Sequence, residues 1–446
     1  MSSRKIRLGD FLIRSKIPVD IEDNKKYKRV TIRTKHQGVS VRDFEIGSKI
    51  GTKKQFILKA GQFVLSKIDA MYGAFGIAPD EVDGAIITGN FWAYDYDKNI
   101  VSIEWFNHFT NSPDFYDLCR RASTGITHRK YLDEDFFLSY EVNLPDLNEQ
   151  ENLVVSIDSI REKISSLENE LTHQLTLLEN LNQAILQEAV QGKLVKQDPK
   201  DEPASELLQR IKAEKATLRQ AQGKGKKEKP LPPIKPEEIP FEIPENWVWC
   251  RLGEICEIKR GKGPKYSEMG VSKMLNQKCI RWYEVDLQYC KSIDEEWFNS
   301  ISDDFIVKEN DVLVNSTGDG TIGRSAIAHK DVDGYVYDSH ILKITSIISQ
   351  MFICYYINSN YGQEQVNKSK GATSTKQHEL GVNKLSNFTI PLPPLSEQKR
   401  IVAEIEKQFA KTKQLKEHII ANQQATEQLL KALLHQAFEV KETETV

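Results

Sequence analysis

The sequence predicts an α+β protein built by tandem duplication, in which a globular α/β domain followed by a long helix occurs twice. Three observations predict this class. LPDLNEQENL at 144–153 recurs as LPPLSEQKRI at 392–401, a constant 248 positions later. Short β-like runs with turn residues precede each copy, and a long apolar pattern at helical spacing follows each copy. One structural unit is therefore repeated along the chain.

Length and composition agree with two or more globular domains. The chain has 446 residues, of which 39% are hydrophobic and 28% are charged. No apolar run approaches the roughly 20 residues of a membrane-spanning helix. The N-terminal MSSRKIRLGDFLIRSK lacks the apolar core of a secretory signal, so we expect a cytoplasmic protein. The six cysteines form no CxxC pair and no cluster with histidine, which predicts reduced, structural thiols.

The repeat extends beyond the opening motif. Downstream, the apolar positions of the two helical patterns match without a gap. Upstream, matching segments lie 244 to 250 positions apart, as expected where loops accept small insertions. These segments are RLGDF (7–11) with RLGEI (251–255), GAFG (73–76) with GTIG (320–323), Val-Asp-Gly at 82–84 with 332–334, and STGITHRKYL (123–132) with GATSTKQHEL (371–380).

A long helix is predicted in each copy, over residues 149–191 and 397–439. Asn148 and Ser396 are the expected N-caps, and Asn148 stands three positions before Glu151, as in a capping box. At 1.5 Å per residue, each helix would be roughly 65 Å long.

Apolar residues three or four positions apart predict a coiled-coil seam on each helix. Neither helix would be stable alone in water, so we expect the two to pair with each other. The segment between the repeats is long enough to reach the far end of the pair, which favours an antiparallel arrangement. The predicted seam residues are Ile157, Ile160, Ile164, Leu167, Leu171, Leu178 and Leu181 in the first helix and Ile405, Leu415, Ile419, Leu429 and Leu433 in the second.

The segment between the repeats has a different composition. It holds half of the chain's 16 prolines, the basic stretch GKGKKEKP and one short helical pattern, ASELLQRIKAEKATL. We expect a partly mobile linker with an embedded helix. The predicted segments are a globular domain at 1–146, a helix at 147–195, the linker at 196–245, a globular domain at 246–394, and a helix with a C-terminal tail at 395–446.

The sequence offers no catalytic motif. RGKGPKY (260–266) has its glycines and lysines in the wrong order for a phosphate-binding loop. NSPDF (111–115) lacks the second proline of the Asn-Pro-Pro-aromatic motif of adenine methyltransferases, and no glycine-rich cofactor loop accompanies it. No Glu-x-Lys of a nuclease follows Pro79-Asp80, and the nine histidines are scattered. We therefore predict a non-catalytic chain with no metal and no cofactor of its own.

Basic loops in the globular domains point to nucleic acid instead. The net charge of −3 does not indicate this, but acidic helices can offset basic loops elsewhere. Arg and Lys suit phosphates and guanine edges, and Thr, Gln and Asn suit base edges. One such loop would be explained as solvated surface, but four at matched places favour DNA binding. The loops are KKYKRVTIRTKHQGVSVR (25–42), STGITHRKY (123–131), EIKRGKGPKYSEMG (257–270) and VNKSKGATSTK (366–376).

The repeated Leu-Pro-x-Leu-x-Glu-Gln motif, the segment IPENWVWCRLGEI (243–255) and the GAFG and GTIG turns resemble the DNA-specificity (S) subunit of type I restriction–modification systems. The resemblance covers essentially the whole chain. It implies that the globular parts are target recognition domains, each reading one half of a bipartite DNA sequence. It also implies that the helices form an antiparallel coiled coil that fixes the spacer between the half-sites.

The resemblance further implies partners and cofactors outside this chain. Methyltransferase (M) subunits, of which two are expected, would dock on this scaffold and use S-adenosylmethionine to methylate adenine. Restriction (R) subunits would cleave DNA with ATP and Mg. Family members read the major groove through loops, so the residues expected to contact double-stranded DNA are Arg33, Lys35, His36, Arg42, His128, Arg129, Arg260, Lys262, Lys265, Lys370, Thr373 and Lys376.

Three other hypotheses remain open at the level of sequence. One is the specificity subunit of a type IIB-like restriction system. Another is a coiled-coil scaffold that binds protein and no DNA. A third is a fused restriction–methylation enzyme, which the lack of cofactor motifs disfavours.

Overall fold

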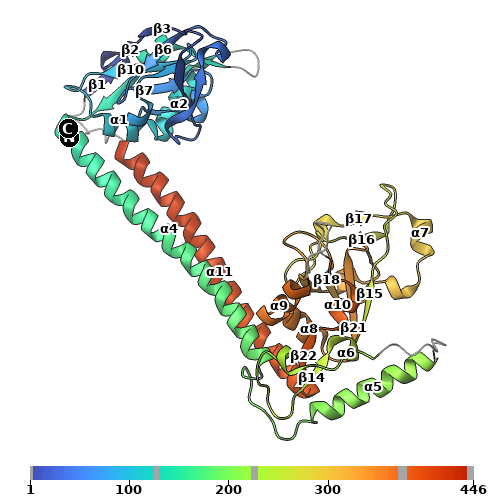
Figure 1. Cartoon of the computed structure of the whole chain (residues 1–446). Helices are drawn as coiled ribbons and strands as arrows, with labels where there is room; N and C mark the ends of the chain where they lie inside the picture. Colours follow the sequence, from blue (N-terminus) through green and yellow to red (C-terminus); the bar gives the residue numbers. More distant parts are fainter. Residues whose placement is uncertain (1–3, 125–129, 222–229, 370–378, 439–446) are drawn as a thin grey trace. The chain divides into compact units, whose positions relative to one another are not determined.

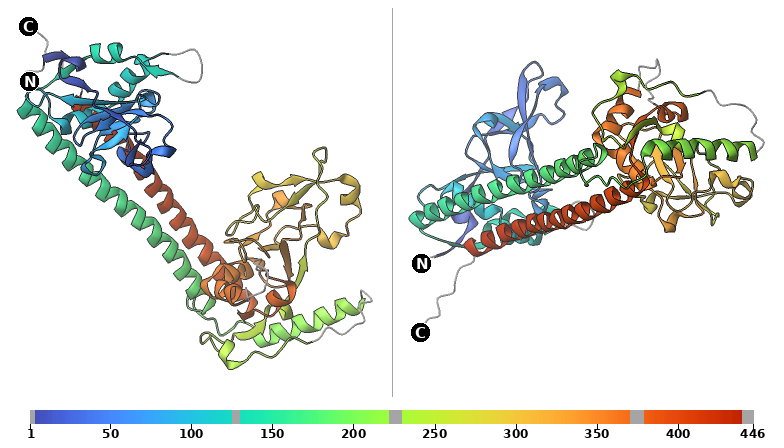
Figure 2. Two further views of the ribbon diagram at one scale, coloured as in Figure 1. Left: turned by 45° about the horizontal axis from the view of Figure 1, so that its top comes forward. Right: turned by 90° about the horizontal axis from the view of Figure 1, so that it is seen from below.

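The structure is a computed structural model that describes residues 4–124, 130–221, 230–369 and 379–438. It divides into two compact units, Met1–Thr172 with Ile420–Val446, and His173–Ile419. Each unit holds one globular domain together with parts of both long helices (Figures 1 and 2). None of the helices in the described ranges is long and apolar enough to cross a membrane.

The first globular domain contains two larger sheets. One has the strand order β2-β10-β7-β8 and the other β3-β6-β9-β4-β5, while β1 pairs with β13 and β11 with β12. An aromatic core joins the four-stranded sheet to α1 and α2, with ring centroids 5.0 to 6.4 Å apart among Phe63, Phe75, Phe106 and Phe115. The elements are β1 (Arg4–Arg7), β2 (Leu12–Ser15), β3 (Pro18–Asp20), β4 (Lys26–Ile32), β5 (Val39–Ile46), β6 (Lys54–Leu58), β7 (Phe63–Ser66), β8 (Phe75–Ile77), β9 (Ala85–Ile87), β10 (Phe91–Tyr96), α1 (Ile103–Thr110), α2 (Pro113–Ala122), β11 (Ser123–Thr124), β12 (Tyr131–Leu132), α3 (Glu134–Ser139) and β13 (Glu141–Leu144).

The second globular domain repeats this plan. Its four-stranded sheet has the order β15-β21-β18-β19, which matches β2-β10-β7-β8, and β14 pairs with β22 as β1 does with β13. A three-stranded sheet, β17-β16-β20, replaces the five-stranded one. The elements are β14 (Val248–Arg251), α6 (Leu252–Ile255), β15 (Cys256–Arg260), β16 (Lys273–Leu275), β17 (Lys291–Ser292), α7 (Glu295–Asn299), β18 (Val312–Asn315), β19 (Ser325–Ile327), β20 (Val336–Tyr337), β21 (Ile341–Ser346), α8 (Gln350–Asn358), α9 (Asn360–Ser369), α10 (Val382–Ser386) and β22 (Thr389–Leu392).

The duplication predicted from the sequence is confirmed, with one change in alignment. GAFG was aligned with GTIG, but the residue structurally equivalent to Gly73 is Gly323. Both have left-handed backbones, with φ of 81° and 83°. A Cβ atom on Gly73 would meet Tyr116 of α2, and one on Gly323 would meet Val366 of the matching α9. The short GxxG patterns could not fix this register, because glycines recur at 318, 320 and 323.

The Gln of the repeated motif explains why the motif occurs in both units. Gln150 and Gln398 are fully buried. Each donates from its side-chain amide to the carbonyl of the first proline after Leu in its own motif, at 2.9 Å. Each also accepts from a backbone N–H at the start of the neighbouring helix, Ser102 at 2.7 Å and Ser349 at 3.1 Å. The motif therefore joins each long helix to its globular domain, because one side chain satisfies polar groups on both.

The first long helix, α4, spans Leu147–Val190. Asp146 caps it, because its carboxylate accepts a hydrogen bond from the backbone N–H of Glu149 at 2.9 Å. The prediction of Asn148 as N-cap, with Glu151 completing a capping box, is therefore wrong. Asn148 lies inside the first turn of α4. The pair with the capping spacing is Asp146 and Glu149, two positions before Asn148 and Glu151.

The second long helix, α11, spans Leu395–Phe438. It also begins before the predicted N-cap, Ser396, so that prediction is wrong as well. The Ser396 hydroxyl donates to Asp201 of the linker instead. Arg400, one turn on, pairs with the same carboxylate at 2.6 Å. The start of α11 is thus fastened by the linker.

The two long helices pair in an antiparallel sense. In the first unit, residues near the start of α4 pack on the same core as Phe438 at the end of α11. In the second unit, Thr412 in the first half of α11 donates a hydrogen bond to Asn182 near the end of α4, at 2.8 Å. Figures 1 and 2 show the two helices side by side.

Burial follows one line of predicted seam residues on each helix. Ile157, Ile164 and Leu171 are buried, as are Ile405 and Ile419, and Ile160, Leu178 and Leu433 are half-buried. The prediction is wrong for four leucines that are 45 to 52% exposed, namely Leu167, Leu181, Leu415 and Leu429.

The position of these four leucines explains their exposure. Each stands three residues after a member of the inward line, which puts it about 60° to one side of that line. A residue four positions on lies about 40° to the other side, and Asn182, which occupies such a position, contacts α11. A mixed spacing of three and four could not tell the two flanks apart.

The described part of the linker packs on the second unit. It contains α5 (Ala204–Ala221), which buries Ala204, Leu207 and Ile211 in the core of that unit. Arg251 then holds the returning chain, with a guanidinium that donates to Pro232 and Pro233 carbonyls and pairs with Glu238 at 2.8 Å. The embedded helix was predicted, but its attachment was not.

Candidate nucleic-acid interface

The β4–β5 hairpin carries four of the predicted DNA-contacting residues. Its turn, residues 33–38, closes with a hydrogen bond from the Arg33 N–H to the Gly38 carbonyl at 3.0 Å. Lys35 and His36 have left-handed backbones with φ of 58° and 54°, a conformation uncommon outside glycine. Two backbone bonds fix the turn to the segment before β8, from Lys35 N–H to Tyr72 at 2.7 Å and from His36 N–H to Gly73 at 2.9 Å.

Charge is distributed unevenly along this hairpin. Near its base, Arg29 forms a bidentate pair with Asp43 across the strands, with distances of 2.6 and 2.7 Å. The pKa of the Asp43 carboxyl is lowered, mainly by the hydrogen bonds from Arg29. From residue 30 to residue 41 the sequence has no carboxylate, although it includes Arg33 and Lys35. The turn therefore carries basic side chains and no carboxylate of its own, whereas the pair between Arg29 and Asp43 neutralises the base.

The four predicted residues of the hairpin have different environments. Arg33 and Lys35 are exposed. Arg42 is exposed on the edge strand β5 and lies 3.6 Å from Asp43. The His36 side chain is half-buried instead, and its Nε2 lies 2.9 Å from the Thr110 hydroxyl of α1. The structure thus brings two of the four predicted side chains together at the tip.

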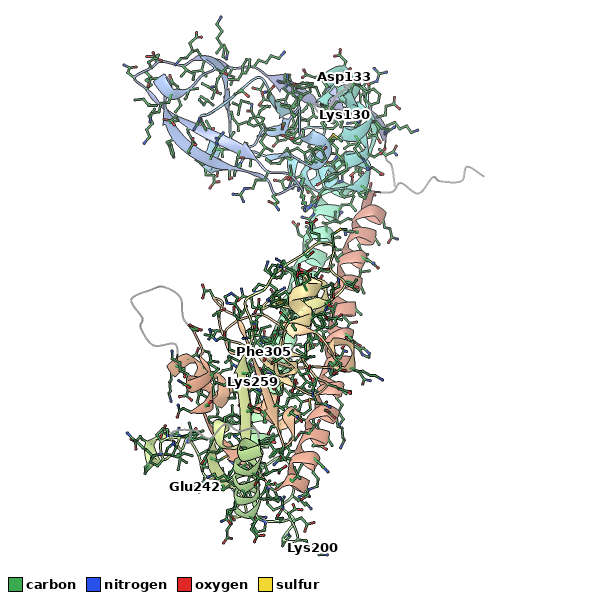
Figure 3. All side chains as sticks on the ribbon, turned by 90° about the vertical axis from the view of Figure 1, so that its right-hand side faces the viewer. Lys130, Asp133, Lys200, Glu242, Lys259 and Phe305 are labelled. Carbon is green, nitrogen blue, oxygen red and sulfur yellow. The ribbon has the colours of Figure 1, made fainter. Side chains whose placement is uncertain are left out.

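The three predicted basic residues of the second domain that the structure describes all contact neighbours. Arg260, at the end of β15, pairs with Glu379, and Lys265 lies 3.2 Å from Asp294. Lys262 lies over the ring of Phe305, with Nζ 4.4 Å from its centroid. Figure 3 labels Phe305 beside Lys259, another residue of β15. These three lysine and arginine residues are spread along one segment rather than gathered at one tip.

Five predicted contacts fall outside the described residues. They are His128 and Arg129 in the first domain and Lys370, Thr373 and Lys376 in the second. Lys130, labelled in Figure 3, stands directly after the first of these two segments.

Sequence reasoning missed several exposed side chains beside the predicted ones. In the first domain, Thr34 and Gln37 are exposed in the hairpin turn, and Tyr72 is 57% exposed next to Lys35. In the second domain, Trp282 is 43% exposed, with the Arg324 guanidinium 5.7 Å from its ring centroid. Thr34 and Gln37 lie within residues 25–42, one of the basic segments predicted to bind DNA. No sequence pattern distinguished Trp282, because its neighbour Arg324 is distant in the chain.

No metal centre emerges from the described part of the chain, where no three His, Cys, Asp or Glu side chains gather as ligands would. All six cysteines are free thiols, and five of them are buried. Each globular domain exposes basic and aromatic side chains, which are residue types typical of nucleic-acid interfaces.

Comparison with known proteins places this architecture in a family. Residues 3–177 and 244–423 match the type I restriction modification DNA specificity domain. The chain is 33% identical to the specificity subunit of the type I restriction enzyme EcoEI of Escherichia coli over 373 residues, which cover 72% of this chain. It is 30% identical to the EcoAI specificity subunit of the same species over 363 residues, which cover 68% of this chain. The chain spans 62% and 59% of the lengths of these two relatives.

Solved structures share the fold. A chain from a type I restriction–modification complex superposes with a TM-score of 0.66 at 17% identity, over 98% of this chain and 97% of that one. The HsdS subunit of Thermoanaerobacter tengcongensis gives 0.55 at 18% identity, over 98% and 96%. These two likenesses show a shared fold with repeated globular domains and paired long helices. This chain belongs to the type I restriction–modification DNA specificity family.

Proposed function

We propose that this chain is the DNA-binding specificity subunit of a type I restriction–modification complex. Each globular domain reads one half of a bipartite target, and the helix pair sets the spacer between the halves. The observation that carries the proposal is the duplication itself: two related domains are joined by matching helices that pair in opposite directions. Successive major grooves on one face of DNA lie roughly 34 Å apart, a separation suited to a helical spacer.

The chain itself has no catalytic role in this proposal. Methyltransferase subunits, two per complex, supply S-adenosylmethionine and the adenine chemistry, and restriction subunits cleave DNA with ATP and Mg. Exposed leucines on both long helices support docking of a partner there, because apolar side chains gathered on a solvent-facing flank favour protein contacts. Leu167 of α4 and Leu415 of α11 are both exposed, and they occupy matching places in the repeat, 248 positions apart.

Divergence between the domains supports separate half-sites. The five-stranded sheet with its basic hairpin occurs in the first domain, and a three-stranded sheet takes its place in the second. The four-stranded sheets and the long helices are alike. Two domains that perform the same task on different bases would differ in this way.

Methylome sequencing tests the proposal directly. The chain would be co-expressed with the methyltransferase subunit encoded beside it, and genomic N6-methyladenine would be mapped by single-molecule sequencing. We expect one asymmetric bipartite motif that disappears when this chain is omitted. An active methyltransferase that modifies no such motif would favour the coiled-coil scaffold hypothesis. Gene neighbours that encode separate M and R subunits would distinguish the type I system from a type IIB-like one.

A further inference from the structure

We propose that the β4–β5 hairpin tip is the base-reading element of the first domain and that His36 with Thr110 holds it in its reading conformation. His36 is then a positioning residue rather than a DNA contact. This inference rests on the proposed function and assigns roles within it.

The hairpin has the two-stranded form and the basic charge of a groove-reading ribbon. B-DNA admits a two-stranded β-ribbon in its major groove, which is about 12 Å wide. The strands pair from Lys26–Ile46 to Ile32–Val39, and the residues beyond that pair form the tip. The tip exposes Arg33, Thr34, Lys35 and Gln37. These types suit guanine O6 and N7, the thymine methyl, phosphate and adenine N6 and N7.

The tip conformation is strained and requires support. Two consecutive non-glycine residues in the left-handed region are unfavourable for L-amino acids, so surrounding contacts must determine the turn. The backbone bonds to Tyr72 and Gly73 supply part of this support. Gly76 lies close beneath, since a Cβ atom there would stand 3.3 Å from the Gly38 Cα.

His36 supplies the side-chain support. Its ring packs edge-on against Phe75, with centroids 5.5 Å apart. The Thr110 hydroxyl donates to the Asn107 carbonyl at 2.8 Å, so it is left to accept the hydrogen bond from His36 Nε2–H. Thr110 is fully buried at the end of α1, which makes it a fixed anchor.

The groups around His36 keep its ring neutral. Burial, together with the nearby charges of Arg161 and His108, lowers its pKa to about 4. His108 of α1 lies 2.9 Å from Asp158 of α4, the carboxylate that faces this cluster. A neutral, half-buried ring is poorly suited to a phosphate, but it is well suited to a hydrogen bond within the domain.

The test uses the full chain in complex with its methyltransferase subunits and a duplex DNA pool with a randomised segment. Bound duplexes would be selected and sequenced to give the information content of each half-site. R33A and K35A identify the half-site read by the tip. We expect T110V and H36N to reduce discrimination at that half-site about 5- to 10-fold, as expected for one hydrogen bond, and to leave the other half-site unchanged.

Two controls separate positioning from folding. T110S keeps the hydroxyl and should restore wild-type discrimination. T217V removes an exposed threonine hydroxyl from α5, where it bonds only to the helix carbonyl of Ala213, and should have no effect. Wild-type discrimination in T110V, or an equal loss at both half-sites, would overturn the inference. A wild-type complex that enriches no bipartite sequence would refute the proposed function itself.

Discussion

At the scale of single residues, the buried glutamine of the repeated motif joins each long helix to its globular domain, a role that the sequence pattern did not indicate. Gln150 and Gln398 each bridge a proline carbonyl and the N–H that opens α1 or α8. A buried polar group that loses its partner costs more than the hydrogen bond itself contributed. These glutamines therefore fix where the globular domain meets the long helix.

This role predicts the effect of Q150A. The substitution would leave the Ser102 N–H and a proline carbonyl without a partner, so the unit should lose about 1–3 kcal/mol of unfolding free energy. Urea denaturation of the full chain measures the change. The exposed Gln187 of α4 provides the control, because Q187A should cost less than about 0.5 kcal/mol. Equal effects of the two variants would contradict the bridging role.

The buried histidines of the first domain predict a dependence of stability on pH. The pKa of His36 falls from its ordinary 6.5 to about 4, and burial also lowers that of His108. The unfolded chain then binds protons that the folded chain does not. Stability from these groups is complete above about pH 6.5 and is lost as the pH falls towards 4.

Urea midpoints measured between pH 7 and pH 5 test this expectation. The wild-type midpoint should fall with pH, and H36N should show a shallower fall because one of the two groups is gone. H329N alters an exposed histidine of the second unit and should follow the wild-type slope. A slope that H36N leaves unchanged would show that His36 is not buried as described.

At the scale of elements, the helix pair depends on one inward line rather than on every apolar residue. The line repeats every seven residues and includes Ile164 and Leu171 on α4 and Thr412 and Ile419 on α11. Polar Thr412 bonds to Asn182 across the pair. A partly buried polar pair of this kind costs stability but fixes the register of the helices.

The two flanks of α4 can be distinguished by matched substitutions. Leu171 is 5% exposed and Leu167 is 45% exposed, although they stand one turn apart. L171A should therefore destabilise the pair by about 2–5 kcal/mol, because it leaves a cavity. L167A should cost less than about 1 kcal/mol. Thermal unfolding of both variants would measure the difference, and a reversed order would show that the seam lies on the other flank.

At the scale of the whole molecule, the helix pair is proposed to set the spacing of two DNA half-sites. Removing one heptad from each helix shortens the pair by about 10 Å. Residues 170–176 and 418–424 are suitable, because they occupy matching positions in the repeat. The spacer should shrink by about three base pairs while both half-sites stay the same.

Methylome sequencing of this deletion checks the prediction. Insertion of one heptad at the same two places should lengthen the spacer by a similar amount. If the half-sites changed and the spacer did not, the helices would not be the ruler.

The sequence by itself determined the duplication, the two long helices, the linker helix and the basic character of the hairpin. Each of these rests on local spacing or on a direct repeat, which pattern reading can detect. The cap of α4 was missed by two positions, because Asp146 was as good a cap as Asn148 and the pattern could not choose between them.

Only the tertiary structure decided which apolar flank is buried and which of the described basic side chains are exposed. Leu167 and Leu171 are equivalent in the sequence pattern, but packing in the structure buries only Leu171. In the sequence, His36 was predicted to contact DNA like Arg33 and Lys35. In the structure its ring is hydrogen-bonded to Thr110, a residue distant in the chain. Contacts between residues far apart in sequence leave no local pattern, so they appear only when the chain is folded.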